Sequence, residues 1–147
     1  MELYELTKHA LVMAGDCEAQ VMAVMPWGVA KLMADDYELF LYPVDDLEPV
    51  YLESYMIREL GFKKSRRLGA YVLQIGALEI RIYNVAERPS YEPPEFEVEV
   101  ALAIGVGNGN GKGPVRMPIE CHHELMKVLD NCRNYRYGDP LSQLLEE

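Results

Sequence analysis

The chain has 147 residues, half of them apolar, and a formal net charge of −10 at pH 7. This length fits one domain or two small ones, and the apolar content is too high for a disordered protein. Three cysteines form no disulfide framework, and a chain of this size folds without one, so the composition indicates a reducing compartment.

The start of the chain and its most apolar stretch predict a cytoplasmic protein. The acidic start of the chain argues against a signal peptide. The most apolar stretch, residues 19–34, is interrupted by Pro26, Gly28 and Lys31 and is too short to span a membrane. We therefore expect no membrane contact.

The negative charge is concentrated in the first part of the chain. Residues 1–60 hold 12 acids and three bases, whereas residues 61–147 hold 12 acids and 11 bases. An acidic surface supports solubility and repels nucleic acid. It can also bind a basic partner or imitate the phosphate backbone of DNA, although the sequence favours the solubility interpretation.

The first 42 residues predict a small β unit. Short runs bounded by turn residues predict four strands, over residues 9–14, 19–25, 28–33 and 37–42. Four short, closely spaced strands suggest a small curled sheet or an SH3-like β-barrel. Residues 2–14 also place Leu3, Leu6, Ala10 and Met13 at helical spacing, so this segment is predicted either as a strand or as a helix.

A connector and a helix follow. Residues 44–50 predict the connector, and residues 52–60 predict the helix, whose shared apolar face is formed by Leu52, Tyr55, Met56 and Leu60. Gly61 is expected to end the helix in the left-handed conformation. Phe62 is then expected to pack back on Ile57.

Alternating patterns predict a second sheet. After the basic run at 63–67, strands are predicted over residues 70–75 and 78–83 around a turn at Gly76-Ala77. Residues 87–95 predict an extended proline-rich loop, and a half-exposed strand is predicted from Phe96 towards Ile104. A Gly/Asn loop over residues 105–114 and a returning strand over residues 115–119 complete the sheet.

The last part predicts the clearest helix, over residues 120–132. Its apolar stripe is formed by Cys121, Leu125, Val128, Leu129 and Cys132. Leu141, Leu144 and Leu145 predict a short terminal turn or helix after Pro140. The whole pattern predicts an α+β protein, with a small SH3-like β-barrel-type part over residues 1–48 and, over residues 49–147, a β-sheet packed with two helices.

The glycine-rich loop from Gly105 to Gly113 fails the tests for phosphate binding. A P-loop needs Ser or Thr after Gly-Lys, but Gly113 follows Lys112, and Val106 stands where the first glycine is required. The dinucleotide fingerprint fails because residue 110 is Asn. The sequence leaves open whether this loop is functional or only flexible.

One segment is dense in metal-ligating residue types, namely Glu120, His122, His123 and Glu124. Adjacent residues of a helix point about 100° apart, so the two histidines do not face one ion. The sequence therefore predicts no metal site and keeps these four residues as weak candidates. His122 is expected at the edge of the apolar stripe, and His123 on the solvent side.

Catalytic patterns are also missing from the sequence. Cys121 and Cys132 lie on the apolar stripe, and Cys17 lies between two acids, whereas a reactive thiolate needs an electropositive setting. The paired acids at 35–36 and 45–46 fall in predicted turns, where Asp is common for backbone reasons. We predict no catalytic residue and no cofactor, and the sequence leans away from an enzyme.

A basic patch stands out on this acidic chain. Residues 61–88 carry six bases and two acids. Such a patch can contact a phosphate backbone or an acidic protein face, or simply be solvated at the end of a helix. The candidate binding residues are Lys63, Lys64, Arg66, Arg67 and Arg81.

Three short motifs resemble those of a group of small proteins. They are the segments 47–52 (Leu-Glu-Pro-Val-Tyr-Leu), 60–64 (Leu-Gly-Phe-Lys-Lys) and 123–125 (His-Glu-Leu). Their order, from residue 37 to about residue 130, is similar to that of small uncharacterised proteins from prophages and mobile elements of gut anaerobic bacteria. The resemblance implies a β-rich start, a short helix, strands and a late helix, together with a phage-like origin, and it implies no activity.

The charge asymmetry and the failed catalytic patterns favour a non-enzymatic interaction module that binds another protein. Two alternatives remain. One is a metal-dependent enzyme that uses the Glu120–His123 cluster, and the other is a nucleic-acid-binding accessory protein that uses the basic turn at 63–67.

Overall fold

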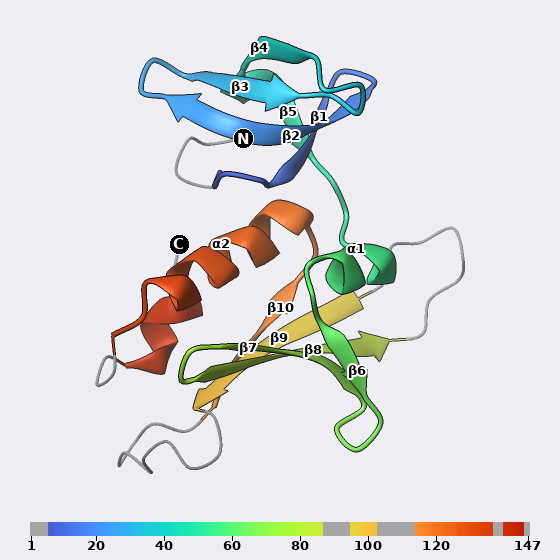
Figure 1. The fold of residues 1–147 in the computed structure, drawn as a ribbon, viewed down its shortest axis with the longest axis vertical. Coiled ribbons are helices and arrows are strands. Elements are labelled where there is room, and N and C mark those ends of the chain that lie inside the picture. The colour runs from blue at the N-terminus through green and yellow to red at the C-terminus, as the bar shows by residue number, and fades with distance from the viewer. Residues whose placement is uncertain (1–5, 87–94, 103–113, 137–139, 146–147) are drawn as a thin grey trace. The chain divides into compact units, whose positions relative to one another are not determined.

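The computed structural model describes residues 6–86, 95–102, 114–136 and 140–145, which fall into two compact units. The first unit comprises residues 1–51 and 121–127, and the second comprises residues 52–120 and 128–146. Each unit contains one antiparallel sheet, and the described residues add two α-helices (Figure 1). The expected α+β class is therefore confirmed.

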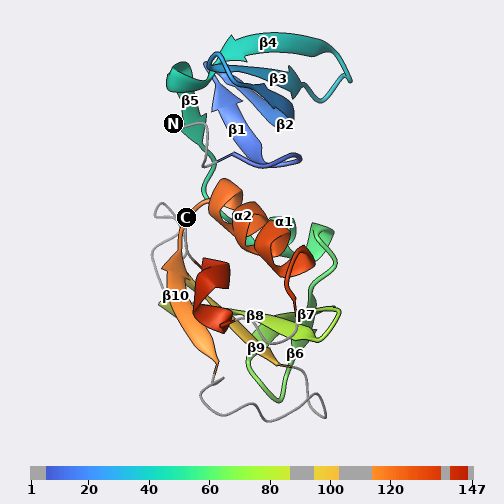
Figure 2. The ribbon, with the colours of Figure 1, turned by 90° about the vertical axis from the view of Figure 1, so that its left-hand side faces the viewer.

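The first unit contains a five-stranded antiparallel sheet with the strand order β4-β3-β2-β1-β5 (Figure 2). Its strands are β1 (Leu11–Ala14), β2 (Cys17–Met25), β3 (Val29–Met33), β4 (Leu39–Pro43) and β5 (Leu47–Pro49). The four strands predicted up to residue 42 are all present. Residues 6–14 contain a strand and no helix, so the helical alternative is wrong for this part, while residues 2–5 lie outside the described residues.

The predicted connector at residues 44–50 is wrong in part, because it contains the 3-10 helix η2 (Val44–Asp46) and strand β5. Strand β5 pairs with β1, with Leu47 opposite Ala14 and Pro49 opposite Val12. Three residues are too few to show an alternating pattern, so the sequence gives little local signal for this strand. Pairing with a distant partner and burial of Leu47 define it.

The second unit contains a sheet with the order β10-β9-β8-β7-β6. Its strands are β6 (Lys63–Ser65), β7 (Ala70–Ile75), β8 (Leu78–Ala86), β9 (Glu95–Leu102) and β10 (Val115–Ile119). The predicted hairpin at Gly76-Ala77 and the returning strand at residues 115–119 are confirmed. Two expectations need correction, since the basic run begins with a strand and Glu95 belongs to β9 rather than to a loop.

The alternation of apolar and polar residues along β8 and β9 determines the core of the second unit. One face of β8 and β9 is fully buried, namely Leu78, Ile80, Ile82, Phe96, Val98 and Val100. The short 3-10 helix η3 (Leu141–Leu145), where the sequence predicted a turn or helix, lies against β9 and β10. The predicted proline-rich loop and Gly/Asn loop fall mostly at residues 87–94 and 103–113, outside the described residues.

Helix α1 (Ser54–Glu59) is shorter than predicted. Leu52 precedes it and donates its N–H to the carbonyl of Glu120 instead of joining the helix. The buried residues of α1 are Met56 and Ile57, while Tyr55 is 43% exposed, so the predicted apolar face is only partly right. Gly61 follows with φ of +102°, as expected for a left-handed helix end.

Helix α2 (His122–Arg133) buries the whole predicted stripe from Cys121 to Cys132. Two details of its first turn are wrong. His122 is only 4% exposed, and His123 is half-buried rather than on the solvent side. The reason is that residues 121 and 122 are bonded to the first sheet and to Val50, contacts that helical periodicity does not show. No helix in the described ranges is long and apolar enough to cross a membrane.

Candidate interaction surface

The sheet of the first unit has an apolar inner face and a mixed opposite face on which large apolar side chains are in the majority. Its inner face is buried and is formed by Val12, Ala14, Ala19, Val21, Ala30 and Leu32. Strand pairing places another set on the opposite side, which we call the outer face. Its large apolar members are Leu11, Met13, Met25, Val29, Met33, Leu39 and Leu41, and its polar members are Glu18, Gln20, Lys31 and Glu48. The solvent-facing side of an antiparallel sheet normally carries mostly polar side chains, so the share of large apolar residues on this outer face is unusual.

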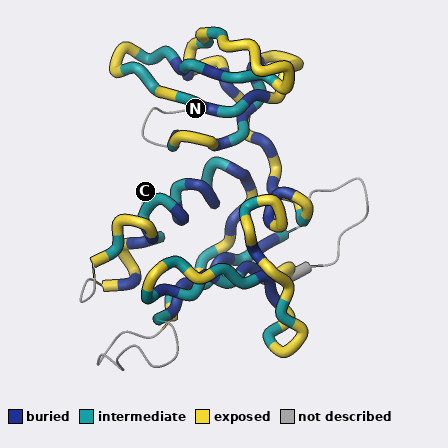
Figure 3. The backbone as a smooth tube through the Cα atoms, in the orientation of Figure 1, coloured by how far each residue is buried: buried dark blue, intermediate teal, exposed yellow. Residues whose placement is uncertain are grey.

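Exposure on the outer face is greatest along β4. Leu41 is 63% exposed, and Leu39 is also exposed. Between them Phe40 is half-buried, so exposed and half-buried residues alternate along β4. Figure 3 colours the backbone by this burial. Six large apolar or aromatic side chains of the described residues are exposed, and four of them lie between residues 27 and 41. Grouped exposure of this kind marks interaction sites more often than single exposed residues do.

Two aromatic side chains in turns complete this group. Trp27, between β2 and β3, is 74% exposed, and Tyr37, between β3 and β4, is 80% exposed. Tyr37 has φ of +64°, which is costly for a bulky residue and is frequent at functional positions. The turn is held by Tyr37 N–H donating to the Ala34 carbonyl and by Glu38 N–H donating to Oδ1 of Asp36.

A hollow of about 260 Å³ lies beside Tyr37 in the first unit. It combines two carboxylates with an aromatic ring and an apolar floor, and it is lined mainly by Leu11, Glu18, Gln20, Met33, Asp35 and Tyr37. Met33 is the direct pairing partner of Leu39, so the hollow lies at the end of the outer face where β4 begins. Its chemistry suits a side chain with an apolar stem and a cationic end.

The predicted basic residues are only partly brought together. Lys63 and Lys64 lie exposed on β6, and Arg66 and Arg67 lie exposed in the turn that follows. The Nζ atom of Lys64 lies 5.9 Å from the centre of the Tyr71 ring. These four cations therefore share one exposed segment of the second unit.

Arg81 is engaged differently. On the solvent-facing side of the second sheet, its Nε donates to Glu79 at 2.7 Å and its Nη1 donates to Glu99 at 2.8 Å. Arg116 makes a similar contact with Glu97 at 2.6 Å and lies 4.2 Å above the ring of Tyr83. Two carboxylates of the same sheet thus balance the charge of Arg81.

The four weak metal candidates do not converge. Nδ1 of His122 accepts a hydrogen bond from Leu11 N–H at 2.9 Å, and Oε1 of Glu124 accepts one from Cys121 N–H at 3.0 Å. Among the described residues, no group of three or more His, Cys, Asp or Glu side chains is placed to hold a metal ion.

Burial determines the charge of His122. Removal from water, with a smaller contribution from neighbouring His123, lowers the pKa of His122 to about 4. The imidazole is therefore neutral at pH 7, and since Nδ1 accepts a bond, its proton lies on Nε2. His122 is part of the fold of the first unit, where it joins α2 to β1.

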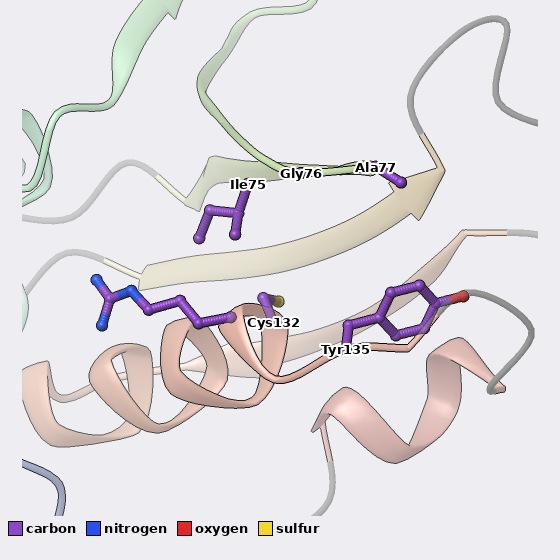
Figure 4. A pocket seen from close by; sticks show the side chains of 6 residues that line it. Ile75, Gly76, Ala77, Cys132 and Tyr135 are labelled. Carbon is purple, nitrogen blue, oxygen red and sulfur yellow. The ribbon is translucent and has the colours of Figure 1, made fainter.

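A second hollow, of about 350 Å³, lies in the second unit between the β7–β8 turn and the end of α2. Figure 4 shows Ile75, Gly76 and Ala77 on one side and Cys132 and Tyr135 on the other. Burial raises the pKa of the Cys132 thiol to about 12, so this sulfur stays protonated at neutral pH and offers no nucleophile.

No protein family, curated protein or solved structure matched the chain.

Sequence reasoning identified residues 37–42 as a strand but missed the outer face. The available signal was that β4, with the sequence Leu-Phe-Leu-Tyr-Pro, is apolar at every position. A strand of this kind is either buried on both sides or exposes an apolar side, and only the structure decides between the two.

Proposed function

We propose that this protein is a non-enzymatic interaction module that binds another protein through the outer face of its first unit. The observation that supports this most directly is the group of exposed apolar and aromatic side chains around β4, namely Trp27, Tyr37, Leu39 and Leu41. Large aromatic side chains are enriched in protein interfaces because they bury much area at a small cost in conformational entropy.

The charge around this surface favours a protein partner over a nucleic acid. The first 60 residues have a net charge of −9, and the only base on the strands of the outer face is Lys31. A phosphate backbone is repelled by such a surface. An apolar centre with an acidic margin suits a protein whose contact region is apolar and basic.

The arrangement of the first unit supports an SH3-like interpretation. The chain passes through β1 to β4 in order, and β5 then returns to pair with β1, as expected when a five-stranded sheet curls towards a barrel. We further propose that the module acts in the cytoplasm, in keeping with its free cysteines, and that it has the phage-like origin that its motifs imply.

A second candidate function rests on the basic turn of the second unit. Four cations, from Lys63 to Arg67, are exposed together, and an acidic protein face or a nucleic acid would bind there. Gel shifts at low salt with duplex DNA and with RNA test the nucleic-acid form of this proposal. Binding that is lost in the Arg66→Gln/Arg67→Gln variant supports it, and absence of binding contradicts it.

Site-specific photocrosslinking in living cells tests the leading proposal. A photoreactive phenylalanine analogue placed at Leu39 samples the outer face, and the same analogue at Gln74, an exposed position on β7, serves as the matched control. We expect a discrete protein adduct from position 39 and none from position 74. The same adducts from both positions, or none from position 39, would contradict the proposal.

A further inference from the structure

The two sheets have four edge strands, and these strands differ in whether they contain charged residues. Natural proteins protect sheet edges from unwanted pairing with charged residues, especially lysine, and with proline. Edge β6 carries Lys63 and Lys64, and edge β10 carries Arg116 and Pro118. Edge β5 is three residues long and contains Glu48 and Pro49.

Edge β4 has the least of this protection. It contains no charged residue, and its proline, Pro43, is the last residue of the strand. No other described strand pairs with its far side. β4 is therefore the one edge strand, among those that the structure describes, that carries no charged residue and exposes apolar side chains.

The hydrogen bonds at both ends of β4 show which backbone groups face outwards. The Glu38 carbonyl accepts from Ala34 N–H, and Val44 N–H donates to the Gly28 carbonyl, so positions 38 and 44 turn towards β3. Because this direction alternates along an antiparallel strand, the N–H and carbonyl groups of Leu39 and Leu41 point to the open edge. These same two residues also have exposed side chains.

We infer that β4 accepts an extended segment of the partner as an added strand, and that this segment is apolar at its centre and basic at its ends. The inference rests on the proposed function and specifies the partner of the same surface. Main-chain hydrogen bonds to Leu39 and Leu41 hold the added strand, while the apolar side chains of the outer face select its alternate residues.

Negative charge at both ends of β4 supports a partner segment whose ends are basic. Exposed acids precede the strand at Asp35, Asp36 and Glu38, and others follow it at Asp45 and Asp46. The hollow beside Tyr37 adds Glu18 at the first of these ends and has room for a lysine or arginine side chain. A basic residue that leaves the edge past Leu39 meets two carboxylates and an aromatic ring there.

The same charges disfavour a second copy of this chain as the occupant. In an antiparallel β4–β4 pair, the acids that precede β4 in one copy lie beside the acids that follow it in the other. Like charges would therefore meet at both ends of the pair, at a cost in free energy.

A synthetic peptide tests the inference with the unaltered protein. The probe is Lys-Lys-Val-Thr-Val-Lys-Lys, with blocked ends, and the control replaces every lysine by glutamate. Fluorescence anisotropy is expected to show saturable binding of the basic peptide and at least about tenfold weaker binding of the acidic one. Equal binding of both would overturn the assignment of a basic partner.

N-methylation of the peptide backbone separates strand addition from simple apolar contact. Only alternate residues of an added strand turn their N–H groups to the edge. We compare a peptide that is N-methylated at both valines with one that is N-methylated at the threonine. One of the two peptides should lose binding, and the other should retain it. Equal effects of the two patterns would overturn strand addition.

Two variants at one position repeat the test on the protein. Leu41→Pro removes an outward N–H and Leu41→Ala shortens the same side chain, while thermal melts check that both variants fold. We expect Leu41→Pro to weaken peptide binding by about tenfold or more, and Leu41→Ala by about threefold. Equal losses in two folded variants would argue against an added strand.

The remaining outcomes separate this inference from the proposed function. A specific crosslink from position 39 together with no peptide binding leaves the interaction module standing and removes the strand-addition inference. Concentration-dependent dimers in sedimentation analysis that disappear in Leu41→Pro, again without peptide binding, would assign the edge to a second copy and overturn the basic partner. Loss of the crosslink itself would remove both proposals.

Discussion

At the scale of single residues, His122 joins two parts of the first unit that are far apart in sequence. Its ring accepts the N–H of Leu11 in β1, and its own backbone N–H donates to the carbonyl of Val50. The buried ring can accept the Leu11 N–H only while the imidazole is neutral. The stability of the protein is therefore linked to the protonation of this one side chain.

We predict that His122 makes unfolding depend on pH below neutrality. The folded pKa of about 4 lies below the ordinary value of 6.5, so the unfolded state binds the proton more readily. The contribution of His122 is fully present above pH 6.5 and is lost as the pH falls towards 4, by up to about 3 kcal/mol. Urea unfolding at several pH values measures this loss.

His122→Asn supplies the control, because its side-chain oxygen can accept the Leu11 N–H without titrating. The difference in free energy of unfolding between the two proteins should shrink as the pH falls from 6.5 to 4. A constant difference over that range would show that His122 is not the titrating group.

At the scale of elements, long periodic segments were predicted well and short ones were not. The stripe of α2 and the alternation of β8 and β9 repeat often enough to identify element type and buried face. Strands β5 and β6 have three residues each and show no period, so pairing with distant strands defines them. Burial of His122 depends on β1, which is more than 100 residues away, and no local pattern contains it.

The end of α1 gives a prediction at this scale. Gly61→Ala should lower the free energy of unfolding by about 1–2 kcal/mol, because φ of +102° is unfavourable for a residue with a Cβ. The added carbon would lie 3.7 Å from Cδ1 of Leu73, an ordinary contact, so backbone strain rather than a clash is the cause. Chemical denaturation measures the loss.

Gly61→Asn is the matched variant, since Asn tolerates positive φ better than Ala does. A smaller loss for Asn than for Ala supports the backbone explanation. If both substitutions cost nothing, α1 ends in some other way.

At the scale of the whole molecule, charge and apolar surface are distributed unequally between the units. The first 60 residues hold nearly all of the net charge, and the first unit also holds the outer face with its open edge. The second unit balances its charges locally, as Arg81 does with Glu79 and Glu99. The sequence revealed the charge asymmetry directly, whereas the position of the apolar face required the strand register.

This distribution predicts salt-dependent association with the basic peptide. Raising the salt concentration from about 50 to 300 mM should slow association several-fold and change dissociation little, because screening acts on long-range attraction. Stopped-flow fluorescence measures both rates. The Glu18→Gln/Asp35→Asn variant should show a weaker salt dependence, and Glu59→Gln, in the second unit, should behave as the wild type. An association rate that does not respond to salt would contradict the electrostatic argument.

The open edge at β4 also has a consequence for how the protein behaves in concentrated solution. An unprotected apolar edge is a template for stacking between copies, and mutual repulsion of the acidic first part opposes that stacking. The repulsion weakens as the pH falls towards 4.8, the sequence pI, where the net charge of the whole chain vanishes. Colloidal stability should thus depend on the same carboxylates that we assign to partner selection, so mutations that neutralise them would make the protein both less selective and more prone to aggregate.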